Sequence, residues 1–415
     1  MIPLESALEI VLAHAPCLPV ENVDFQDALG RVLAEDISSD LDLPPFPRSA
    51  MDGYALRSED VIHAPTRLQV IGTVPAGTNP SFEVKKGQAA QIMTGAPVPL
   101  GANSVHIVEK TRLHGTDVEI LELVKPGQNV VPRGKEVTTG DTVLRKGTLL
   151  DPAAVAVAAT VGKTRLQVGR RPRVAVIATG NELVPPTLKP GPAQIRNSNG
   201  YSLSAQAANA GARVSYLGVA EDDKVSLSPL IRHGLTHDVL LLSGGVSMGR
   251  LDLVEEVLAE FGVRILIDKV ALKPGKPTVF GIGPNDHLVF GLPGNPVSTM
   301  VTFELFVRPA LAKMAGSVNT GRPQLKATLK GPLASKGPRR AYLPGWLETN
   351  SEGALPEAHP IPSRGSGDIV AFSKANALLI LPENIDLMET GETIRVHPLD
   401  SFLFKENPWQ NETPK

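Results

Sequence analysis

Residues 239–249, VLLLSGGVSMG, run from an apolar segment into a glycine-rich turn that could take part in chemistry. Around Ser247 the letters fit the G-x-S-x-G pattern in which esterases present a nucleophilic serine. The same glycines would let backbone amides surround an anion at the start of the next helix. We therefore weigh an esterase nucleophile against an anion-binding turn, whose phosphate contacts would come from Ser243, Gly244, Gly245 and Ser247.

The downstream sequence argues against the esterase. That mechanism needs an acidic residue and then a histidine after the serine, together with an upstream oxyanion loop. His287, His359 and His397 do follow it, but none comes after a recognisable strand of a hydrolase sheet, and the upstream loop is missing. Taken alone, the turn could still be glycine geometry without any ligand. The sequence also lacks a Walker A motif, which excludes a P-loop NTPase.

Two further glycine-rich turns point to a phosphorylated ligand. Residues 271–278, ALKPGKPT, place Lys273 and Lys276 on either side of a rigid Pro-Gly turn, where they could meet phosphate or another oxyanion. Residues 291–298, GLPGNPVS, join a buried strand to a helix and offer a second helix start suited to anions. One such turn could be packing, but three in one region predict a phosphorylated ligand.

Carboxylates form a second group of candidate residues. They follow the ends of predicted strands at Glu182, at Asp222 or Asp223, and at Asp252. Residues at the ends of neighbouring parallel strands gather at one edge of a sheet, and oxygen ligands beside phosphate are typical of a Mg²⁺ site. Asp52, in SAMDGY, lies in a proline-bounded turn of another region. Either Asp222 or Asp252 alone could instead be a helix cap.

An alternation of strands and helices from Arg173 onward would position these turns. We expect strands at RVAVIAT, RVSYLGVA, DVLLLS and VRILIDKV, and helices at NGYSLSAQAANAGA, KVSLSPLIRHGL and LDLVEEVLAEFG. Such alternation predicts a doubly wound α/β domain with a mostly parallel sheet and right-handed crossovers. Ligands of these sheets bind at the carboxyl ends of the strands.

The regions before and after this α/β segment predict other kinds of secondary structure. Apolar residues at helical spacing predict a helix over 4–15 and a second amphipathic segment in FQDALGRVLAED, from Phe25. DPAAVAVAATVG predicts a helix capped by Asp151. Short Val/Ile/Thr runs between 68 and 131 predict a small all-β module, and similar texture returns after Gly321.

Bulk properties narrow the class of protein. A chain of 415 residues with 42% hydrophobic residues predicts about two to four globular domains. Lys and Arg number 41 against 43 Asp and Glu, so no global field favours nucleic acid or membrane as a partner. Cys17 is the only cysteine, which excludes an internal disulfide and a Cys-rich zinc site. With Glu5 and Glu9 where an export signal needs positive charge, we expect a soluble cytoplasmic protein.

Eight motifs, in order along almost the whole chain, resemble the molybdopterin molybdenumtransferase family, which includes the E domain of gephyrin. They are PPFPRSAMDGYA, IMTGAPVP, IATGNEL, SNGYSL, SGGVSMGRLD, ALKPGKP, GLPGNPVS and GSGDIVAFSKANALLILPE. The resemblance implies an enzyme that inserts molybdate into adenylylated molybdopterin and releases AMP, with Mg²⁺ as cofactor. It also implies an elongated homodimer, with the site shared between the α/β domain of one subunit and the SAMDGY region of its partner. The molybdopterin adenylyltransferase would be a further partner.

The same resemblance assigns roles to residues and bounds to domains. Asp52, Asp252, Lys273 and Lys276 would be catalytic, and Glu182, Asp222 and Asp252 would bind the metal. Substrate contacts would come from Thr94, Ser243, Gly244, Gly245, Ser247, Pro293, Asn295, Pro296, Arg339 and Ser366. The implied domains are a discontinuous N-terminal helical/linker domain (1–43 and 139–170), a β-rich inserted domain (44–138), the α/β domain (171–318) and a C-terminal β-barrel domain (319–405).

Two departures from the family pattern and two alternatives stay open. Pro47-Arg48 stands where the family often has Asp-Asn, and Lys135-Glu136 stands in a frequent R-G-E-D stretch. A gephyrin-like dimeric scaffold with little or no catalysis is one alternative. A free-standing molybdopterin adenylyltransferase, or a related nucleotide hydrolase, is the other. The substrate metal could be molybdenum or tungsten.

Overall fold

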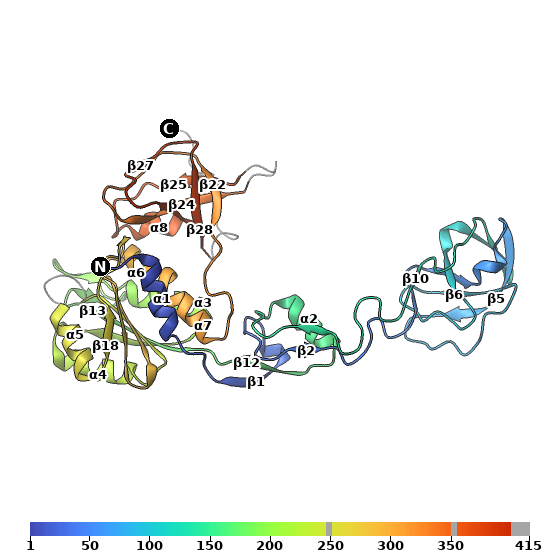
Figure 1. The fold of residues 1–415 in the computed structure, drawn as a ribbon, viewed down its shortest axis with the longest axis horizontal. Coiled ribbons are helices and arrows are strands. Elements are labelled where there is room, and N and C mark those ends of the chain that lie inside the picture. Colours follow the sequence, from blue (N-terminus) through green and yellow to red (C-terminus); the bar gives the residue numbers. More distant parts are fainter. Residues whose placement is uncertain (246–250, 350–354, 400–415) are drawn as a thin grey trace.

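The chain is elongated and has four parts (Figure 1). The computed structural model describes residues 1–245, 251–349 and 355–399. At one end the C-terminal barrel stacks on the α/β domain; helix α2 lies in the middle part, and a small β domain occupies the far end (Figure 1). The predicted fold class is therefore confirmed: a central α/β domain accompanied by a linker domain, a β-rich insertion and a barrel.

The α/β domain is built on a six-stranded sheet in the order β16-β13-β17-β21-β20-β18. Its strands are β13 (Arg173–Thr179), β16 (Arg213–Ala220), β17 (Val239–Ser243), β18 (Arg264–Ile267), β20 (Val279–Ile282) and β21 (Leu288–Leu292). The first four in spatial order are parallel, whereas β18 and β20 are antiparallel neighbours. The parallel strands β17 and β21 are buried throughout, as expected where helices cover both faces of a sheet.

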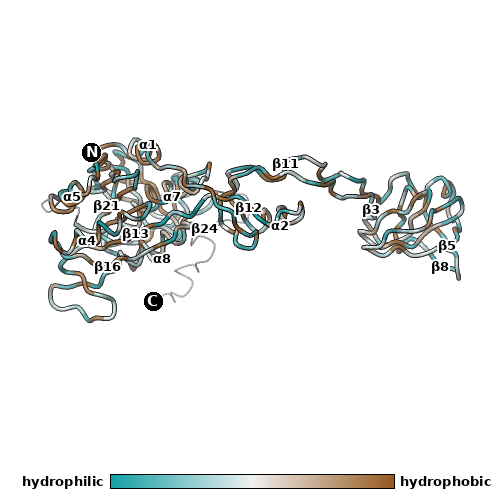
Figure 2. The backbone as a smooth tube through the Cα atoms, turned by 90° about the horizontal axis from the view of Figure 1, so that it is seen from below, coloured by the Kyte–Doolittle hydropathy of each residue, from teal (hydrophilic) through white to brown (hydrophobic). Residues whose placement is uncertain are grey.

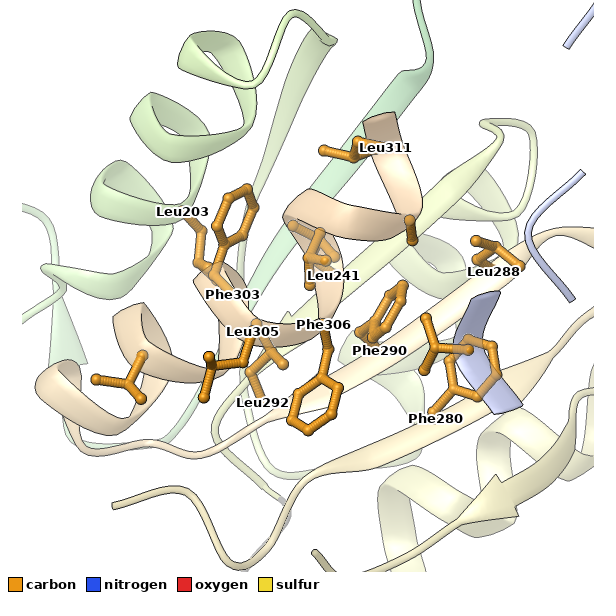
Figure 3. Close-up of a cluster of buried hydrophobic side chains, with 14 of the residues drawn as sticks. Leu203, Leu241, Phe280, Leu288, Phe290, Leu292, Phe303, Leu305, Phe306 and Leu311 are labelled. Atoms are coloured by element: carbon orange, nitrogen blue, oxygen red, sulfur yellow. The ribbon is translucent and has the colours of Figure 1, made fainter. Parts of the chain in front are cut away.

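Helices pack on both faces of this sheet. They are α3 (Asn199–Asn209), α4 (Lys224–Gly234), α5 (Leu251–Glu260), α6 (Pro296–Thr302) and α7 (Arg308–Met314). One turn of π-helix, Phe303–Val307, joins α6 to α7. Figure 3 shows the larger core cluster, in which Phe280, Phe290 and Phe306 pack among leucines from the sheet and the helices. This core supports the carboxyl edge of the sheet from one side.

Helix α1 (Leu4–His14) also belongs to this core. Its buried residues Leu4, Ala7 and Val11 lie in the same cluster as α7, and the Lys313 ammonium donates to the Leu12 carbonyl. The predicted linker domain had included residues 1–43, whereas the structure packs the first helix on the α/β domain. Apolar residues on one face of α1 explain the helix, and their partner comes from about 300 residues further along the chain.

The linker domain consists of paired strands and one helix. Strand β1 (Val20–Asp24) pairs with β12 (Arg165–Gly169), and β2 (Ile37–Ser38) pairs with β11 (Thr142–Leu144). Helix α2 (Pro152–Thr160) is capped as predicted, because Asp151 Oδ1 accepts from the Ala154 amide at 2.7 Å. The predicted amphipathic segment FQDALGRVLAED forms no α-helix: it contains a 3-10 turn, Phe25–Asp27, followed by isolated β-bridges at Val32 and Leu33.

The inserted β domain contains one six-stranded sheet, in the order β7-β4-β6-β5-β9-β8. Its strands are β4 (Gly53–Leu56), β5 (Thr66–Val74), β6 (Gln88–Ile92), β7 (Ser104–Ile107), β8 (Thr111–His114) and β9 (Asp117–Ile120). A short pair, β3 (Arg48–Ser49) with β10 (Val130–Val131), lies where the chain enters and leaves the domain. Two extended segments connect it to the linker domain (Figure 1).

The C-terminal part is a barrel that closes through the pairing of β24 with β26. Its main strands are β22 (Leu325–Leu329), β24 (Arg340–Glu348), β25 (Glu357–Pro360), β26 (Ala377–Leu381) and β28 (Thr393–Pro398), with β23 (Leu333–Ala334), β27 (Leu387–Met388) and helix α8 (Ile369–Lys374) beside them. The two-residue strand β19 (Leu272–Lys273) leaves the α/β domain and pairs with β24. Thus the lysine-bearing turn is attached to the barrel.

The hydrophobic segments lie mainly in the strands and helices that form the cores of the four parts (Figure 2). Each part has its own cluster of buried apolar side chains. Among the residues that the structure describes, no helix combines the length and the apolar composition needed to cross a membrane.

Candidate active site at the carboxyl edge of the sheet

A cavity of about 640 Å³ lies at the carboxyl ends of β13, β17 and β21. This is the edge at which the sequence predicts a ligand. Eight predicted site residues line it: Glu182, Asp222, Ser243, Gly244, Gly245, Pro293, Asn295 and Pro296. Residues of all three predicted anion-binding turns, including Pro277 of the lysine turn, and two of the predicted carboxylates thus meet at this cavity.

The turn after β17 is shaped as much by packing as by any ligand. Gly244 and Gly245 have φ values of +96° and +68°, in the left-handed region that favours glycine. A Cβ atom on Gly244 would lie 2.3 Å from the Thr179 carbonyl oxygen, so no larger residue fits there. The Gly244 amide donates to the Leu292 carbonyl at 3.2 Å and is not free for an anion, contrary to the expectation from sequence. Ser247 lies outside the described residues.

The esterase interpretation finds no support among the described residues. Strands β17 and β21 are parallel, with Val239 opposite Leu288 and Ser243 opposite Leu292. His287 immediately precedes β21 and thus lies at the amino edge of the sheet, about one strand length from the turn. The other two candidate histidines belong to barrel strands β25 and β28.

The third turn joins the α/β domain to the barrel. Asn295 is the N-cap residue of α6, and its Nδ2 atom donates to Ser366 Oγ at 2.9 Å. The Val297 amide donates to the Ser366 carbonyl at 3.0 Å, and Gly367 lines the cavity. The predicted substrate residue Ser366 is therefore at the site, although 71 positions separate it from Asn295 in the sequence.

Two of the three predicted metal ligands, Glu182 and Asp222, line the cavity. Glu182 follows β13, and Asp222 follows β16 with its amide donating to Asn181 Oδ1 at 2.9 Å. Asp223 has a different role, because it accepts from the Ser226 amide at 2.8 Å and caps α4. Asp252 is the second residue of α5, which follows the β17 turn. The described residues contain no group of three or more His, Cys, Asp or Glu side chains arranged to hold a metal.

The two predicted lysines lie on the turn between β19 and β20. The Lys273 ammonium donates to the Lys336 carbonyl at 2.9 Å, and Arg339 Nη1 donates to the Leu272 carbonyl at 2.7 Å. Lys276 is exposed, and its neighbour Pro277 lines the cavity. Three cations from two domains, Lys273, Lys276 and Arg339, are thus gathered on and beside this turn.

Asp52 and Thr94 are far from this cavity within one chain. Both lie in the inserted β domain, at the opposite end of the molecule from the α/β domain (Figure 1). Strands β4 and β6 pair with Gly53 opposite Ile92, which brings the two predicted residues together at adjacent strand ends. Asp52 Oδ1 accepts from the Thr94 amide at 2.6 Å and from Thr94 Oγ1 at 2.9 Å.

These hydrogen bonds favour the ionised form of Asp52. The bond from the Thr94 amide, followed by that from the Thr94 hydroxyl, holds the pKa of Asp52 below its usual value. We expect Thr94→Val to raise this pKa, because the hydroxyl donor disappears while the amide donor stays. NMR titration of the Asp52 carboxyl carbon would measure the change, with Thr73→Val in the same domain as the control. An unchanged pKa would contradict the hydroxyl's contribution.

The two departures from the family pattern contact each other. Arg48 Nη2 donates to Glu136 Oε1 at 2.9 Å, across the two segments that enter and leave the β domain. A second ion pair, Arg133 with Asp42 at 2.6 Å, crosses the same segments. Both arginines are exposed, so each pair contributes little to stability.

Several cavity residues were not assigned a role from the sequence. Thr179, Arg196, Asn197 and Asn199 all line it. Asn197 is fully used by the protein: its Nδ2 donates to the Tyr216 hydroxyl at 2.7 Å and its Oδ1 accepts from the Gly200 amide. Thr179 Oγ1 and Asn199 Oδ1, in contrast, are buried without a partner among the described residues. The signal available in the sequence was their position: Thr179 ends a buried strand, and Asn199 begins a helix.

Comparisons with known proteins agree across the whole chain. Three family models match in order: "MoeA N-terminal region (domain I and II)" over residues 2–162, "Probable molybdopterin binding domain" over 175–313, and "MoeA C-terminal region (domain IV)" over 326–399. A molybdopterin molybdenumtransferase of Nostoc sp. is 37% identical over 385 residues, covering 91% of this chain and 88% of its own.

Two further relatives extend this picture. A molybdopterin molybdenumtransferase of Staphylococcus aureus is 34% identical over 402 residues, with 95% of each chain covered. The crystal structure of a molybdopterin biosynthesis MoeA protein from Pyrococcus horikoshii matches with a TM-score of 0.82 at 32% identity, covering 96% of this chain and 100% of the other. The similarity thus includes the α/β cavity, the barrel and the inserted β domain.

Proposed function

The chain belongs to the molybdopterin molybdenumtransferase family, and we propose that it inserts molybdate into adenylylated molybdopterin and releases AMP. The cavity at the carboxyl edge of the α/β sheet carries the proposal, because it combines glycine-rich turns for phosphate with carboxylates for a divalent cation. Molybdate is a dianion and the phosphoanhydride is negative. Their approach therefore needs cations and oriented donors.

In this proposal the charged and the uncharged residues of the chain have different roles. Lys273, Lys276 and Arg339 would neutralise the oxyanions at the mouth of the cavity. Asn295, which also lines the cavity, would help to orient the phosphates. No nucleophilic side chain is required: the two dithiol sulfur atoms of molybdopterin would replace oxygen atoms of molybdate, which leave as water, and water would cleave the phosphoanhydride so that AMP leaves. This fits a cavity in which the serine at the end of β17 has no histidine beside it.

Magnesium is the cofactor that the donor set would suit. Glu182 and Asp222 line the same cavity, and Asp252 is the second residue of the helix that follows the β17 turn. One or two carboxylates together with substrate phosphates are the usual protein environment of Mg²⁺. A bound Mg²⁺ would supply charge neutralisation at the anhydride. The chain's own carboxylates would hold it next to the glycine turns.

We propose that the working unit is a homodimer, because Asp52 and Thr94 lie at the far end of the chain from the cavity. The neighbouring Met51 and Met93 are exposed by 49% and 39%, which favours a partner that covers this surface. We further propose that the protein works in the cytoplasm and receives its substrate from an adenylyltransferase. Light scattering should give about twice the chain mass of 44.0 kDa. A monomer with full activity would refute the shared site.

One reaction tests the function itself. Purified protein is mixed with adenylylated molybdopterin, Mg²⁺ and molybdate, and AMP is followed by chromatography. The expected result is molybdate-dependent AMP release together with cofactor that activates a molybdenum-free apoenzyme. The same mixture with tungstate in place of molybdate reports which metal is preferred. No AMP release with either oxyanion would contradict the proposal.

A further inference from the structure

Asn199 is the first residue of α3 and reaches two elements of the cavity at once. Its Nδ2 atom donates to Ser243 Oγ at 2.8 Å and to the Gly294 carbonyl at 2.7 Å. A carbonyl oxygen can only accept, so the contact with Gly294 fixes which end of the amide is nitrogen. Both hydrogens of the amide group are thereby used by the protein.

The oxygen end of the same amide is not used in these contacts. Asn199 Oδ1 is buried and has no hydrogen-bond partner among the residues that the structure describes. Thr179 also lines the cavity and is only 3% exposed, and its Oγ1 atom is likewise without a partner among the described residues. Buried polar atoms are almost always paired, and an unpaired one is costly. Two such atoms in one cavity indicate that a bound molecule completes them.

The chemistry of Asn199 Oδ1 restricts what that molecule offers. A carbonyl-type oxygen needs an N–H or O–H donor, whereas a phosphoanhydride or molybdate at neutral pH is an acceptor. We propose that Asn199 recognises the hydrogen-bond donors of the ligand's ring or sugar portion, and thus sets which way round the ligand lies in the cavity. This rests on the proposed function, because the ligand is taken to be adenylylated molybdopterin, which has both donor-bearing rings and a phosphoanhydride.

The phosphates would lie elsewhere in the cavity, beside Glu182 and Asp222, which could bring a divalent cation to them. The start of α6 offers them little, because Pro296 has no N–H and the Val297 amide donates to the Ser366 carbonyl at 3.0 Å. Asn199 Nδ2 thus holds the turn and the Gly294 loop in place, and Oδ1 is left for the uncharged part of the ligand. Ser204, one turn further along α3, donates its hydroxyl to the Gly200 carbonyl and does not line the cavity. It provides a control on the same helix.

The test measures binding by the full-length protein, by calorimetry, for adenylylated molybdopterin and for inorganic pyrophosphate as a competitor. Asn199→Ala should weaken adenylylated molybdopterin about five- to tenfold, the cost of one neutral hydrogen bond, and should change pyrophosphate binding less than twofold. Asn199→Leu, which keeps water out, should behave in the same way if the alanine variant is unstable. Ser204→Ala should bind both ligands like the wild type.

Three results would overturn the inference. Equal weakening of both ligands would mean that Asn199 only shapes the loop. Unchanged binding of adenylylated molybdopterin would mean that Oδ1 contacts nothing in the ligand. Weakening that vanishes when Mg²⁺ is chelated would assign Oδ1 to a water molecule on the metal. Failure of the proposed function looks different, because the wild-type protein itself would then not bind adenylylated molybdopterin.

Discussion

Replacing Lys276 by alanine is expected to lower molybdate-dependent AMP release at least tenfold and to leave the melting temperature and the oligomeric state unchanged. The side chain is exposed, and the described residues offer its ammonium group no ion-pair partner. A surface substitution of this kind normally changes the free energy of unfolding by no more than about 0.5 kcal/mol. A contribution to the stability of the fold therefore does not explain why a lysine stands at this position.

The catalytic loss has a separate cause. The lysine turn is stiffened by Pro274 and Pro277, and Pro277 lines the cavity. If Lys276 stabilises the charge that develops on the transferring oxyanions, its removal should cost about 10²–10³-fold in rate, as for one preorganised donor in an oxyanion site. The measurement is AMP release by chromatography, wild type against variant, at matched concentrations of folded protein.

The matched control is Lys326→Ala. Lys326 is an exposed lysine on barrel strand β22, which does not line the cavity. It should keep the wild-type rate of AMP release. If Lys276→Ala also keeps that rate, the lysine belongs to the solvated surface, and a dimeric scaffold becomes the better description of the protein.

Continuous apolar segments were the most reliable guide to the fold. RVAVIAT corresponds residue for residue to β13, because a strand covered on both faces needs apolar side chains at every position. FQDALGRVLAED fails for the opposite reason. Its apolar spacing fits a helix, but Gly30 adopts φ +72°, and Val32 and Leu33 form β-bridges to Leu149 and Val168. Pairing with distant strands overrides the local pattern.

The site shows a similar division between local and distant information. Turns that follow strands could be assigned to the sheet edge from topology alone, which is why Glu182, Asp222 and Asn295 line the cavity as predicted. Hydrogen bonds could not be assigned, since they depend on atoms brought together from remote parts of the chain. The Gly244 amide donates to the Leu292 carbonyl, whereas Asn199 Oδ1 and Thr179 Oγ1 are the buried cavity atoms without a partner among the described residues.

Two inactive variants should restore activity when they form a mixed dimer. Asp52→Asn removes a charge from the β domain, and Lys276→Ala removes one from the α/β side. Each homodimer should release AMP at least tenfold more slowly than the wild type. If each site combines the α/β cavity of one subunit with the β domain of its partner, a heterodimer carries both changes in one site and neither in the other. Heterodimers isolated with two different tags should therefore recover about half of the wild-type activity.

A second heterodimer tests whether activity could return merely because two impaired subunits associate, without sharing a site. Glu182→Gln and Lys276→Ala both alter the α/β side, and Glu182 lines the same cavity as Pro277. Combining them leaves one damaged residue in each of the two sites, so this heterodimer should stay as inactive as its parents. Recovery in both heterodimers, or in neither, would show that Asp52 does not complete the partner's cavity. Recovery in the first alone would explain why a residue at the far end of the molecule is needed for chemistry at the sheet edge.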